Sequence, residues 1–314
     1  MTTRVWNFLE KTQILSTNKS RSSPAAAYEV EGVRNHYYRH VSQGGWPFST
    51  SAHGWPISDC TAEGLKAVLS IRDLPCVSKS NSCRPIADER LFDAANVILT
   101  LQNSDGGWAT YENTRGGLWY EHLNPSETFG DIMVDISYCE CTTAAVTALV
   151  DFSMAFPSHR ADEVSSSIQA GAEFLRSVQR ADGSWYGSWG CCFTYGCWFG
   201  LDGLAAAGEP NDSEAILKSI SFLIKHQNDD GGWGEDFTSC YDKSYAHALQ
   251  SQVVQTAWAM LGLMAADPAS DDCTEALSRG ASFLRSRQLP SGDWPQESIT
   301  GAIFLTLSSH SHFK

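Results

Sequence analysis

The sequence predicts an all-α protein, built as an α/α barrel (toroid) of paired helices. Three observations support this fold class. Apolar residues recur at helical spacing along most of the 314 residues, one motif repeats through the chain, and the alternating pattern of strands is nearly absent. We count about ten helical segments, whereas a closed barrel of six pairs needs roughly twelve. The barrel is therefore expected to be incomplete at its C-terminal end.

The repeated motif is a helix that ends in Gln, a polar turn that contains Gly, and a Trp shortly afterwards. Asn, Asp and Gly are typical of turns and helix ends, because Gly can adopt positive φ angles. The Gln amide can bind carbonyl groups at the helix end, and the Trp ring can cover that polar contact. We therefore interpret these Trp residues as structural, with sugar binding as the alternative. The four copies are Gln102/Gly106/Trp108, Gln179/Gly183/Trp185, Gln227/Gly231/Trp233 and Gln288/Gly292/Trp294.

Predicted helices connect these turns. Acidic residues at the start of several of them agree with the positive end of the helix dipole. The expected helices are Arg4–Leu15, Thr61–Ile71, Val134–Phe156, Ala161–Gln179, Thr194–Gly208, Asp212–Gln227, Ser251–Ala266 and Asp271–Gln288. We expect residues 1–43 to form an N-terminal helix and an exposed linker, Ser16–Tyr28, and residues 44–314 to form the barrel domain.

Composition argues against several classes of protein. The formal net charge is −14, so a nucleic-acid partner is not expected. No apolar run approaches the roughly 20 residues of a membrane-spanning helix. The first residues lack the apolar core of a signal peptide, so we expect the ten cysteines to be reduced thiols in a cytosolic setting. The cysteine spacings do not match zinc sites and no nucleotide-binding motif is present, so neither a metal nor a cofactor is expected.

The most unusual segment is Gly44–Glu63, where two Trp-Pro pairs precede the string Ser58-Asp59-Cys60-Thr61-Ala62-Glu63. Taken alone, Ser58 or Asp59 is best interpreted as the N-cap of the following helix. The similar string Asp271-Asp272-Cys273-Thr274 is predicted to do only that. Asp59 differs because aromatic residues and His53 surround it in the sequence.

Several motifs together resemble the oxidosqualene cyclases. They are the Gln–Gly–Trp repeats, the string around Asp59, and Gly187-Ser188-Trp189-Gly190 followed by Phe193-Thr194-Tyr195-Gly196. The resemblance runs from about Gly44 to Gly301, after which the sequence departs from that of the family. The family folds as two α-barrel lobes with the active site between them, and this chain resembles only the C-terminal lobe. The resemblance therefore implies an N-terminal-type lobe as partner.

The resemblance also implies roles for individual residues. It makes Asp59 the acid that protonates the epoxide of 2,3-oxidosqualene, with the Cys60 and Cys141 thiols as hydrogen-bond donors to that acid. The implied cavity residues are Phe48, His53, Ile57, Tyr111 and Trp189. The residue types suit this chemistry. Burial raises the pKa of a carboxyl group and keeps it protonated, and aromatic faces stabilise carbocations without trapping them.

The leading hypothesis is a cyclase that converts 2,3-oxidosqualene into a tetracyclic triterpene alcohol, lanosterol-like or protostane-like. The resemblance implies a hydrophobic triterpene substrate and a monotopic position at the surface of the endoplasmic reticulum membrane or lipid droplets, or the cytosol if the chain acts alone. We expect weak or no membrane attachment by this chain alone. Two alternatives stay open. One is a non-catalytic remnant or aromatic-walled helical binding module that lacks its partner lobe. The other is a glycan-active α-barrel enzyme, which needs two carboxylates about 5–10 Å apart.

Overall fold

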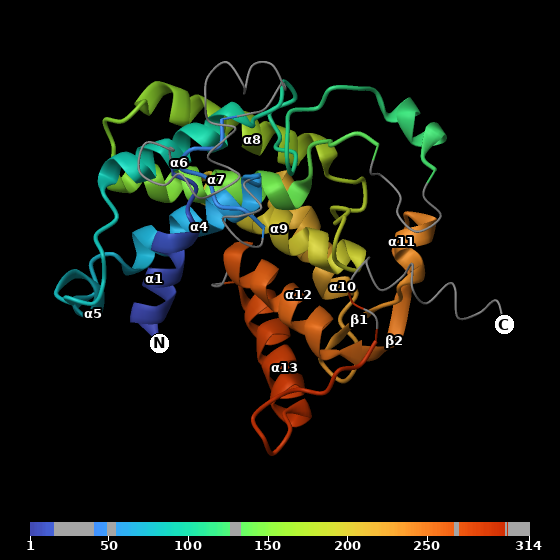
Figure 1. Cartoon of the computed structure of the whole chain (residues 1–314). Coiled ribbons are helices and arrows are strands. Elements are labelled where there is room, and N and C mark those ends of the chain that lie inside the picture. The colour runs from blue at the N-terminus through green and yellow to red at the C-terminus, as the bar shows by residue number, and fades with distance from the viewer. Residues whose placement is uncertain (16–40, 49–54, 126–132, 267–269, 299, 301–314) are drawn as a thin grey trace. The chain divides into compact units, whose positions relative to one another are not determined.

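The computed structural model describes residues 1–15, 41–48, 55–125, 133–266, 270–298 and 300 (Figure 1). The chain divides into two compact units. The first comprises Met1–Leu118, Val134–Ser137 and Ala144–Ala172, and the second comprises Trp119–Met133, Tyr138–Thr143 and Glu173–Lys314. The predicted linker Ser16–Tyr28 and the candidate residue His53 lie outside the described residues.

The described part of the first unit consists of helices joined by loops and turns. Its helices are α1 (Thr2–Thr12), α4 (Ser58–Ile71), α5 (Pro75–Ser78), α6 (Asp88–Thr100), and the parts of α7 (Cys139–Ala155) and α8 (Ala161–Val178) that belong to it. α4 packs against both α1 and α6. The side chains of Leu65, Val68, Leu91 and Ile98 are completely buried along that contact. Burial of apolar surface of this kind is the main stabilising term of such a core.

The second unit adds a short hairpin to its helices. Its elements are the 3₁₀ helix η2 (Leu118–Leu123, from Trp119 on), α9 (Cys192–Ala206), α10 (Glu214–Lys225), β1 (Trp233–Glu235), α11 (Thr238–Asp242), β2 (His247–Gln252), α12 (Val253–Ala266) and α13 (Asp271–Arg287). α9 packs closely against α12. β1 and β2 are antiparallel. None of the helices among the described residues is long and apolar enough to cross a membrane.

The predicted helices are confirmed, with differences at their ends. α8 and α13 begin at the predicted residues, Ala161 and Asp271, and each ends one residue early. α7 begins at Cys139 rather than Val134, because Asp135 binds backbone N–H groups of a distant loop instead of joining the helix. α12 begins at Val253 rather than Ser251, because the preceding residues pair with β1.

The repeat turns fasten one helix to the next. In the second repeat, the side-chain amide of Gln179 donates to the carbonyl of Gly183 at 3.0 Å and to that of Ala215 in α10 at 2.8 Å. The indole N–H of Trp185 donates to the carbonyl of Leu175 at 2.7 Å. Equivalent bonds occur in the repeats of Gln102 and Gln227. The Trp of each of these three repeats is 0% exposed. Their structural interpretation is therefore confirmed.

A fifth repeat, which the sequence search missed, lies in the first unit. The amide of Gln13 donates to the carbonyl of Gly44 at 2.8 Å and to that of Arg90 in α6 at 2.9 Å. The indole of Trp46 donates to Leu9 at 3.1 Å, and Gly44 has a φ of +93°. Gln13 and Gly44 are 31 positions apart, whereas Gln and Gly are four apart in the other copies. A search that allows an insertion inside the turn would have found it.

Candidate active site

Asp59 lies in the first turn of α4 and is partly buried. Its Oδ1 accepts the backbone N–H of Cys60 at 2.7 Å, and the Cys60 thiol donates a further hydrogen bond to the carboxyl group. Burial raises the pKa of Asp59 above its ordinary value, the charge of Glu63 adds to this effect, and the two hydrogen bonds from Cys60 oppose it. Burial also raises the pKa of Cys60 to about 12, so Cys60 remains a thiol donor at neutral pH.

The N-cap interpretation of Ser58 and Asp59 is wrong. The N-cap of α4 is Ile57, and no side chain caps the helix. The Ser58 hydroxyl instead donates to the carbonyl of Ala109 at 2.6 Å, which leaves the Asp59 carboxyl group for other interactions. The similar string in α13 does not cap its helix either. The N-cap is Ser270, which precedes the string and accepts the N–H of Cys273, while Asp271 and Asp272 lie in the first turn.

The other predicted residues of the first unit differ in exposure. Ile57 is 1% exposed and packs inside the unit. Phe48 is 75% exposed and Tyr111 is 41% exposed. The rings of Trp55 and Tyr111 meet edge to face, with centroids 6.3 Å apart. Ile57, Asp59 and Cys60 thus lie together at the start of α4, and the predicted contacts of these residues with a substrate remain predictions.

Asp135 is a positioning residue that sequence reasoning missed. Its carboxylate accepts three backbone N–H groups, from Thr110 at 3.0 Å, from Tyr111, and from Glu112 at 3.2 Å. Burial raises the pKa of Asp135, and the three hydrogen bonds oppose that shift. The carboxylate therefore fixes the loop that carries Tyr111. The only signal in the sequence was an acidic residue inside a segment predicted to be helical.

Cys141 and Trp189 belong to the second unit. Cys141 is completely buried in the first turn of α7, and Trp189 is 37% exposed. The ring of Trp189 lies against that of Tyr138, with centroids 4.7 Å apart. The Glu140 carboxylate accepts the backbone N–H groups of Ser188 and Trp189. Glu140 was not predicted as a site residue. Since Asp59 belongs to the first unit, its predicted contacts with Cys141 and Trp189 remain predictions.

A third buried carboxylate, that of Glu235 in β1, binds the start of α9. It is 0% exposed and accepts the backbone N–H groups of Cys192, Phe193 and Thr194 at 2.9–3.2 Å. Burial raises the pKa of Glu235, and these hydrogen bonds oppose the shift. A carboxylate in this place also interacts favourably with the positive end of the helix dipole. Glu235 fixes the first turn of α9, next to the loop that contains Trp189.

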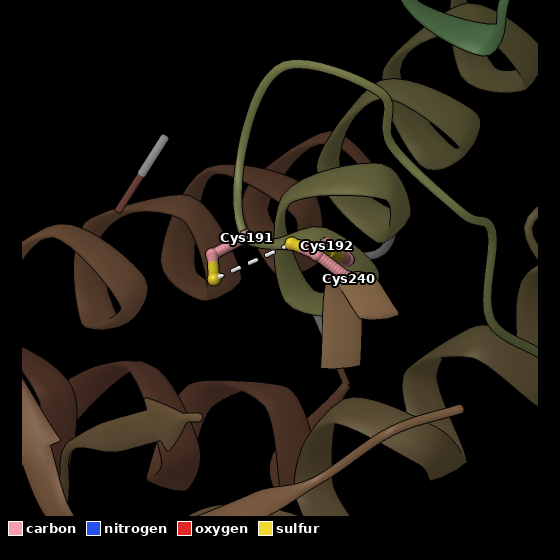
Figure 2. A group of neighbouring side chains, drawn as sticks. All are labelled: Cys191, Cys192 and Cys240. Carbon is pink, nitrogen blue, oxygen red and sulfur yellow. Dashed lines mark hydrogen bonds between the residues drawn. A yellow bond between two sulfur atoms is a disulfide. The ribbon is translucent and has the colours of Figure 1, made fainter. Parts of the chain in front are cut away.

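The cysteines depart from the expectation that all ten are reduced. Cys192 and Cys240 form a disulfide bond, and the other eight are free. The sulfur of Cys191 lies 3.9 Å from that of Cys240 (Figure 2). The expectation rested on the compartment alone, whereas the fold brings the start of α9 against α11 across 48 positions of sequence. Among the described residues, these three cysteines are the one His/Cys/Asp/Glu group with metal-binding spacing, but the disulfide occupies two of the sulfurs.

A cavity of about 670 Å³ in the first unit is separate from the predicted residues. Leu69, Arg72 and Asp73 line it from the end of α4, and Asp88 lines it from α6. Arg72 and Asp88 form an ion pair at 2.7 Å. The cavity contains none of the residues that the sequence predicted for the substrate.

Solved structures share the fold of this chain. A type II terpene cyclase, MstE from Scytonema in complex with geranylgeranyl dihydroxybenzoate, is similar with a TM-score of 0.53. The similarity covers 95% of this chain and 72% of that chain at 17% sequence identity. Such structural neighbours are terpene cyclases with the α/α-barrel fold, so the predicted fold class is confirmed.

Sequence comparison then gives the family. The squalene-hopene cyclase C-terminal domain family matches residues 27–308, and the chain belongs to that family. It is 53% identical over 281 residues to cycloartenol synthase of Dictyostelium discoideum, covering 89% of this chain and 39% of the relative. It is 51% identical over 272 residues to lanosterol synthase of Homo sapiens, covering 85% and 36%. The resemblance to oxidosqualene cyclases is confirmed. The chain spans less than two fifths of the length of these relatives.

Proposed function

We propose that the chain supplies the proton donor of an oxidosqualene cyclase, an isomerase that converts 2,3-oxidosqualene into a tetracyclic triterpene alcohol. The names of its relatives support this reaction class. The observation that carries the proposal is the environment of Asp59 in α4. Its carboxyl group is partly buried, has a raised pKa, and is bound by a thiol that stays protonated at neutral pH.

The reaction begins with proton transfer from the Asp59 carboxyl group to the epoxide oxygen. The carbon–oxygen bond then breaks, and the electrons of successive alkenes close the rings. Loss of a proton ends the reaction, so substrate and product are isomers. The Cys60 thiol stabilises the carboxylate that forms, because a hydrogen bond to a charged acceptor is stronger than one to a neutral acceptor. Cys141 is proposed as a second donor of this kind.

Aromatic side chains would stabilise the cations that follow. Phe48, Tyr111 and Trp189 each present an exposed ring, and an aromatic face attracts positive charge without forming a bond to it. Asp135 and Glu140 position two of these rings through the backbone N–H groups that they accept. His53 and Ile57 are proposed to influence the product. A change of one methyl group at such a position is worth about 1–3 kcal/mol of discrimination.

We also propose that the chain works together with an N-terminal-type lobe at the surface of the endoplasmic reticulum membrane. Exposed apolar side chains of the second unit support a peripheral contact, since Trp119, Leu123 and Met133 are 58%, 62% and 40% exposed. Co-sedimentation with phospholipid vesicles tests this proposal. Trp119→Ser with Leu123→Ser should reduce the bound fraction severalfold, and equal binding of the variant would contradict the contact.

The test of the cyclase uses a two-lobe protein in which the Dictyostelium relative supplies the N-terminal lobe. It is produced in a host that lacks a sterol cyclase, and gas chromatography measures the triterpene alcohols. Asp59→Asn keeps the shape of the side chain and removes the acidic proton, so cyclisation should be lost. Glu89→Gln is the matched control, because Glu89 is an exposed acidic residue in the first turn of another helix, α6, and should be dispensable. Cys60→Ala should lower the rate about tenfold, the effect of one lost hydrogen bond.

Two outcomes would reject the proposal. If Asp59→Asn retained more than about a tenth of the activity, the change in barrier would be too small for the loss of the acid. If the folded two-lobe protein bound a triterpene but formed no product, the non-catalytic binding module would be the better interpretation.

A further inference from the structure

Three sulfur atoms meet in the second unit. Cys191 precedes α9, Cys192 is its first residue, and Cys240 lies in α11 (Figure 2). Cys192 and Cys240 are joined as a disulfide, with their Cα atoms 6.1 Å apart. The Cys191 sulfur is 3.9 Å from the Cys240 sulfur, and the three sulfur atoms lie within 4.8 Å of one another. Cys240 is therefore close to two sulfurs that could each be its partner.

The two sides of this sulfur triad (Cys191, Cys192 and Cys240) are held in place by groups other than the disulfide. Glu235 accepts the backbone N–H of Cys192 at 3.0 Å. The Gln255 side chain donates to the carbonyl of Cys191 at 2.6 Å. At the start of α11, Asp236 accepts the backbone N–H of Thr238 at 2.9 Å. Since these hydrogen bonds do not involve sulfur, the three thiols remain close together after reduction. This fixed proximity favours renewed formation of a disulfide bond.

We propose that the sulfur triad is a thiol–disulfide exchange site, in which Cys240 can pair with either Cys192 or Cys191. The Cys191 thiolate attacks the Cys240 sulfur, so that the Cys191–Cys240 bond forms while the Cys192–Cys240 bond breaks. The bonding electrons leave on Cys192, which takes up the proton that Cys191 has lost. No net oxidation occurs in this step. The first disulfide forms from two thiols and oxidised glutathione, which leaves as two molecules of reduced glutathione.

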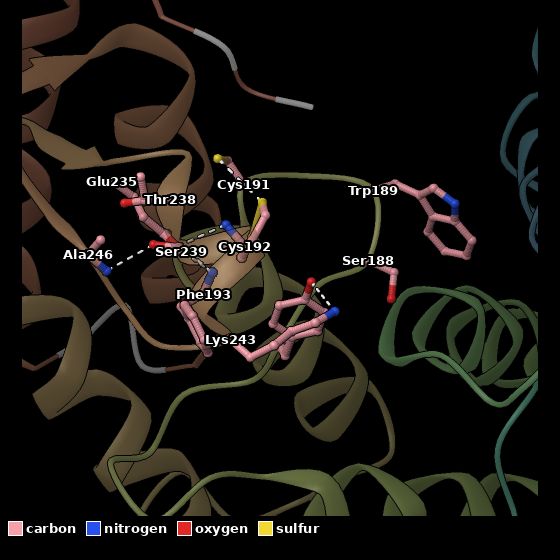
Figure 3. The surroundings of a disulfide bond; sticks show 12 residues. Ser188, Trp189, Cys191, Cys192, Phe193, Glu235, Thr238, Ser239, Lys243 and Ala246 are labelled. Atoms are coloured by element: carbon pink, nitrogen blue, oxygen red, sulfur yellow. Dashed lines mark hydrogen bonds between the residues drawn. A yellow bond between two sulfur atoms is a disulfide. The ribbon is translucent and has the colours of Figure 1, made fainter. Parts of the chain in front are cut away.

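Exchange would move the attachment point of α11. In one state the disulfide joins α11 to the first residue of α9. In the other it joins α11 to Cys191, two residues after Trp189 in the same loop (Figure 3). The Trp189 loop is also held by Glu140, which accepts the backbone N–H groups of Ser188 and Trp189. The pairing of Cys240 thus decides whether the disulfide joins α11 to the start of α9 or to the Trp189 loop.

The surroundings of Cys191 make the exchange slow at neutral pH. Burial, together with the charges of Glu235 and Asp236, raises the pKa of Cys191 to about 12. Glu235 comes from β1, Asp236 follows it, and Cys192 and Cys240 of the triad come from α9 and α11. The attacking species is the thiolate. As long as the pH is below this pKa, the rate of exchange should increase about tenfold for each unit by which the pH rises.

Alkylation mapping of the full chain tests the proposal without any cyclase assay. The protein is treated with oxidised or reduced glutathione, denatured in acid, alkylated, digested and analysed by mass spectrometry. After oxidation, Cys192 and Cys240 should be linked, and the other eight cysteines should be alkylated. After reduction all ten should be alkylated. Cys76→Ser, a change at an exposed cysteine, is the control and should leave the link intact.

Variants separate the two pairings. Cys192→Ser should yield a Cys191–Cys240 link after oxidation, and Cys192→Ala provides a second version should the serine variant not fold. Cys240→Ser should yield neither link. In the wild-type chain, the Cys191–Cys240 link should appear about tenfold faster at pH 9 than at pH 8. The proposal is overturned if all ten cysteines are alkylated after oxidation, or if Cys191 and Cys240 stay unlinked in both variants of Cys192.

Discussion

Two repeat turns of the second unit share one sequence motif but differ in their surroundings. In the repeat of Gln179, the side-chain amide binds its own turn and the carbonyl of Ala215 in α10. In the repeat of Gln288, the amide donates to the carbonyl of Gly292 at 2.8 Å and to no other group among the described residues. The glycines have nearly the same φ, +90° for Gly183 and +88° for Gly292.

The difference shows that formation of the turn and packing of the turn against a neighbouring helix have separate causes. The turn forms in both places, so it depends on local sequence. Burial of the Trp requires the neighbouring helix, because Trp185 is 0% exposed and Trp294 is 41% exposed. A Cβ atom on Gly183 would lie 2.4 Å from the carbonyl oxygen of Lys218, whereas one on Gly292 would meet nothing within 4 Å among the described residues.

The largest predicted contrast is between alanine substitutions at the two glycines. Gly183→Ala should destabilise the second unit by about 4 kcal/mol, because the positive φ is strained and the new methyl group forces α10 away. Gly292→Ala introduces only the strain of a positive φ angle and should lower the free energy of unfolding by about 1 kcal/mol. Urea unfolding followed by circular dichroism measures both. Equal losses would show that Gly183 serves only its own turn.

A smaller contrast is expected at the two tryptophans. Trp185→Phe leaves a cavity and removes the partner of the buried Leu175 carbonyl, at a cost of about 2–3 kcal/mol. Trp294→Phe loses a bond of 3.0 Å to the Leu284 carbonyl at an exposed position, and the expected cost is below about 1 kcal/mol. The same urea experiment applies. A large loss at Trp294 would mean that this repeat is docked in solution.

The smallest contrast concerns the two glutamines. Gln179→Ala removes the amide that donates to the carbonyl groups of Gly183 and Ala215. We therefore expect the free energy of unfolding to fall by about 2 kcal/mol. Gln288→Ala removes one bond at an exposed position and should cost about 0.5 kcal/mol. A double change of Gln179 and Gly183 should cost less than the sum of the single changes, because both act on the contact with α10. Simple additivity would contradict that shared role.

Local features were predictable from the sequence, and features that join distant segments were not. The repeats of Gln102, Gln179 and Gln227 were found because Gln, Gly and Trp lie close together in the chain. Gln13 was missed because its turn contains a long insertion. Its Gly44-Gly45-Trp46 has the Gly-Gly-Trp string of two other copies, but Gln13 lies 31 positions before Gly44.

The candidate site likewise contains residues that the sequence revealed and residues that it did not. Asp59 and Cys60 are adjacent in the sequence, and the family resemblance identified both of them as candidate site residues. Asp135, Glu140 and Glu235 act on backbone N–H groups more than 20 positions away, and a backbone acceptor site leaves no side-chain pattern to detect. The disulfide of Cys192 was missed for a related reason, since composition indicates a compartment but no pairing.

Direct titration of the Asp59 carboxyl group tests the central claim that this residue is an acid held partly out of water. Carbon-13 NMR of labelled aspartate in the full chain follows the signal that disappears in Asp59→Asn. The account predicts a pKa above the ordinary value of 3.8, because burial outweighs the hydrogen bonds from Cys60. It also predicts a further rise in Cys60→Ala, which loses the thiol donor that lowers the pKa. A pKa at or below 3.8, unchanged by Cys60→Ala, would contradict the assignment of Asp59 as the proton donor.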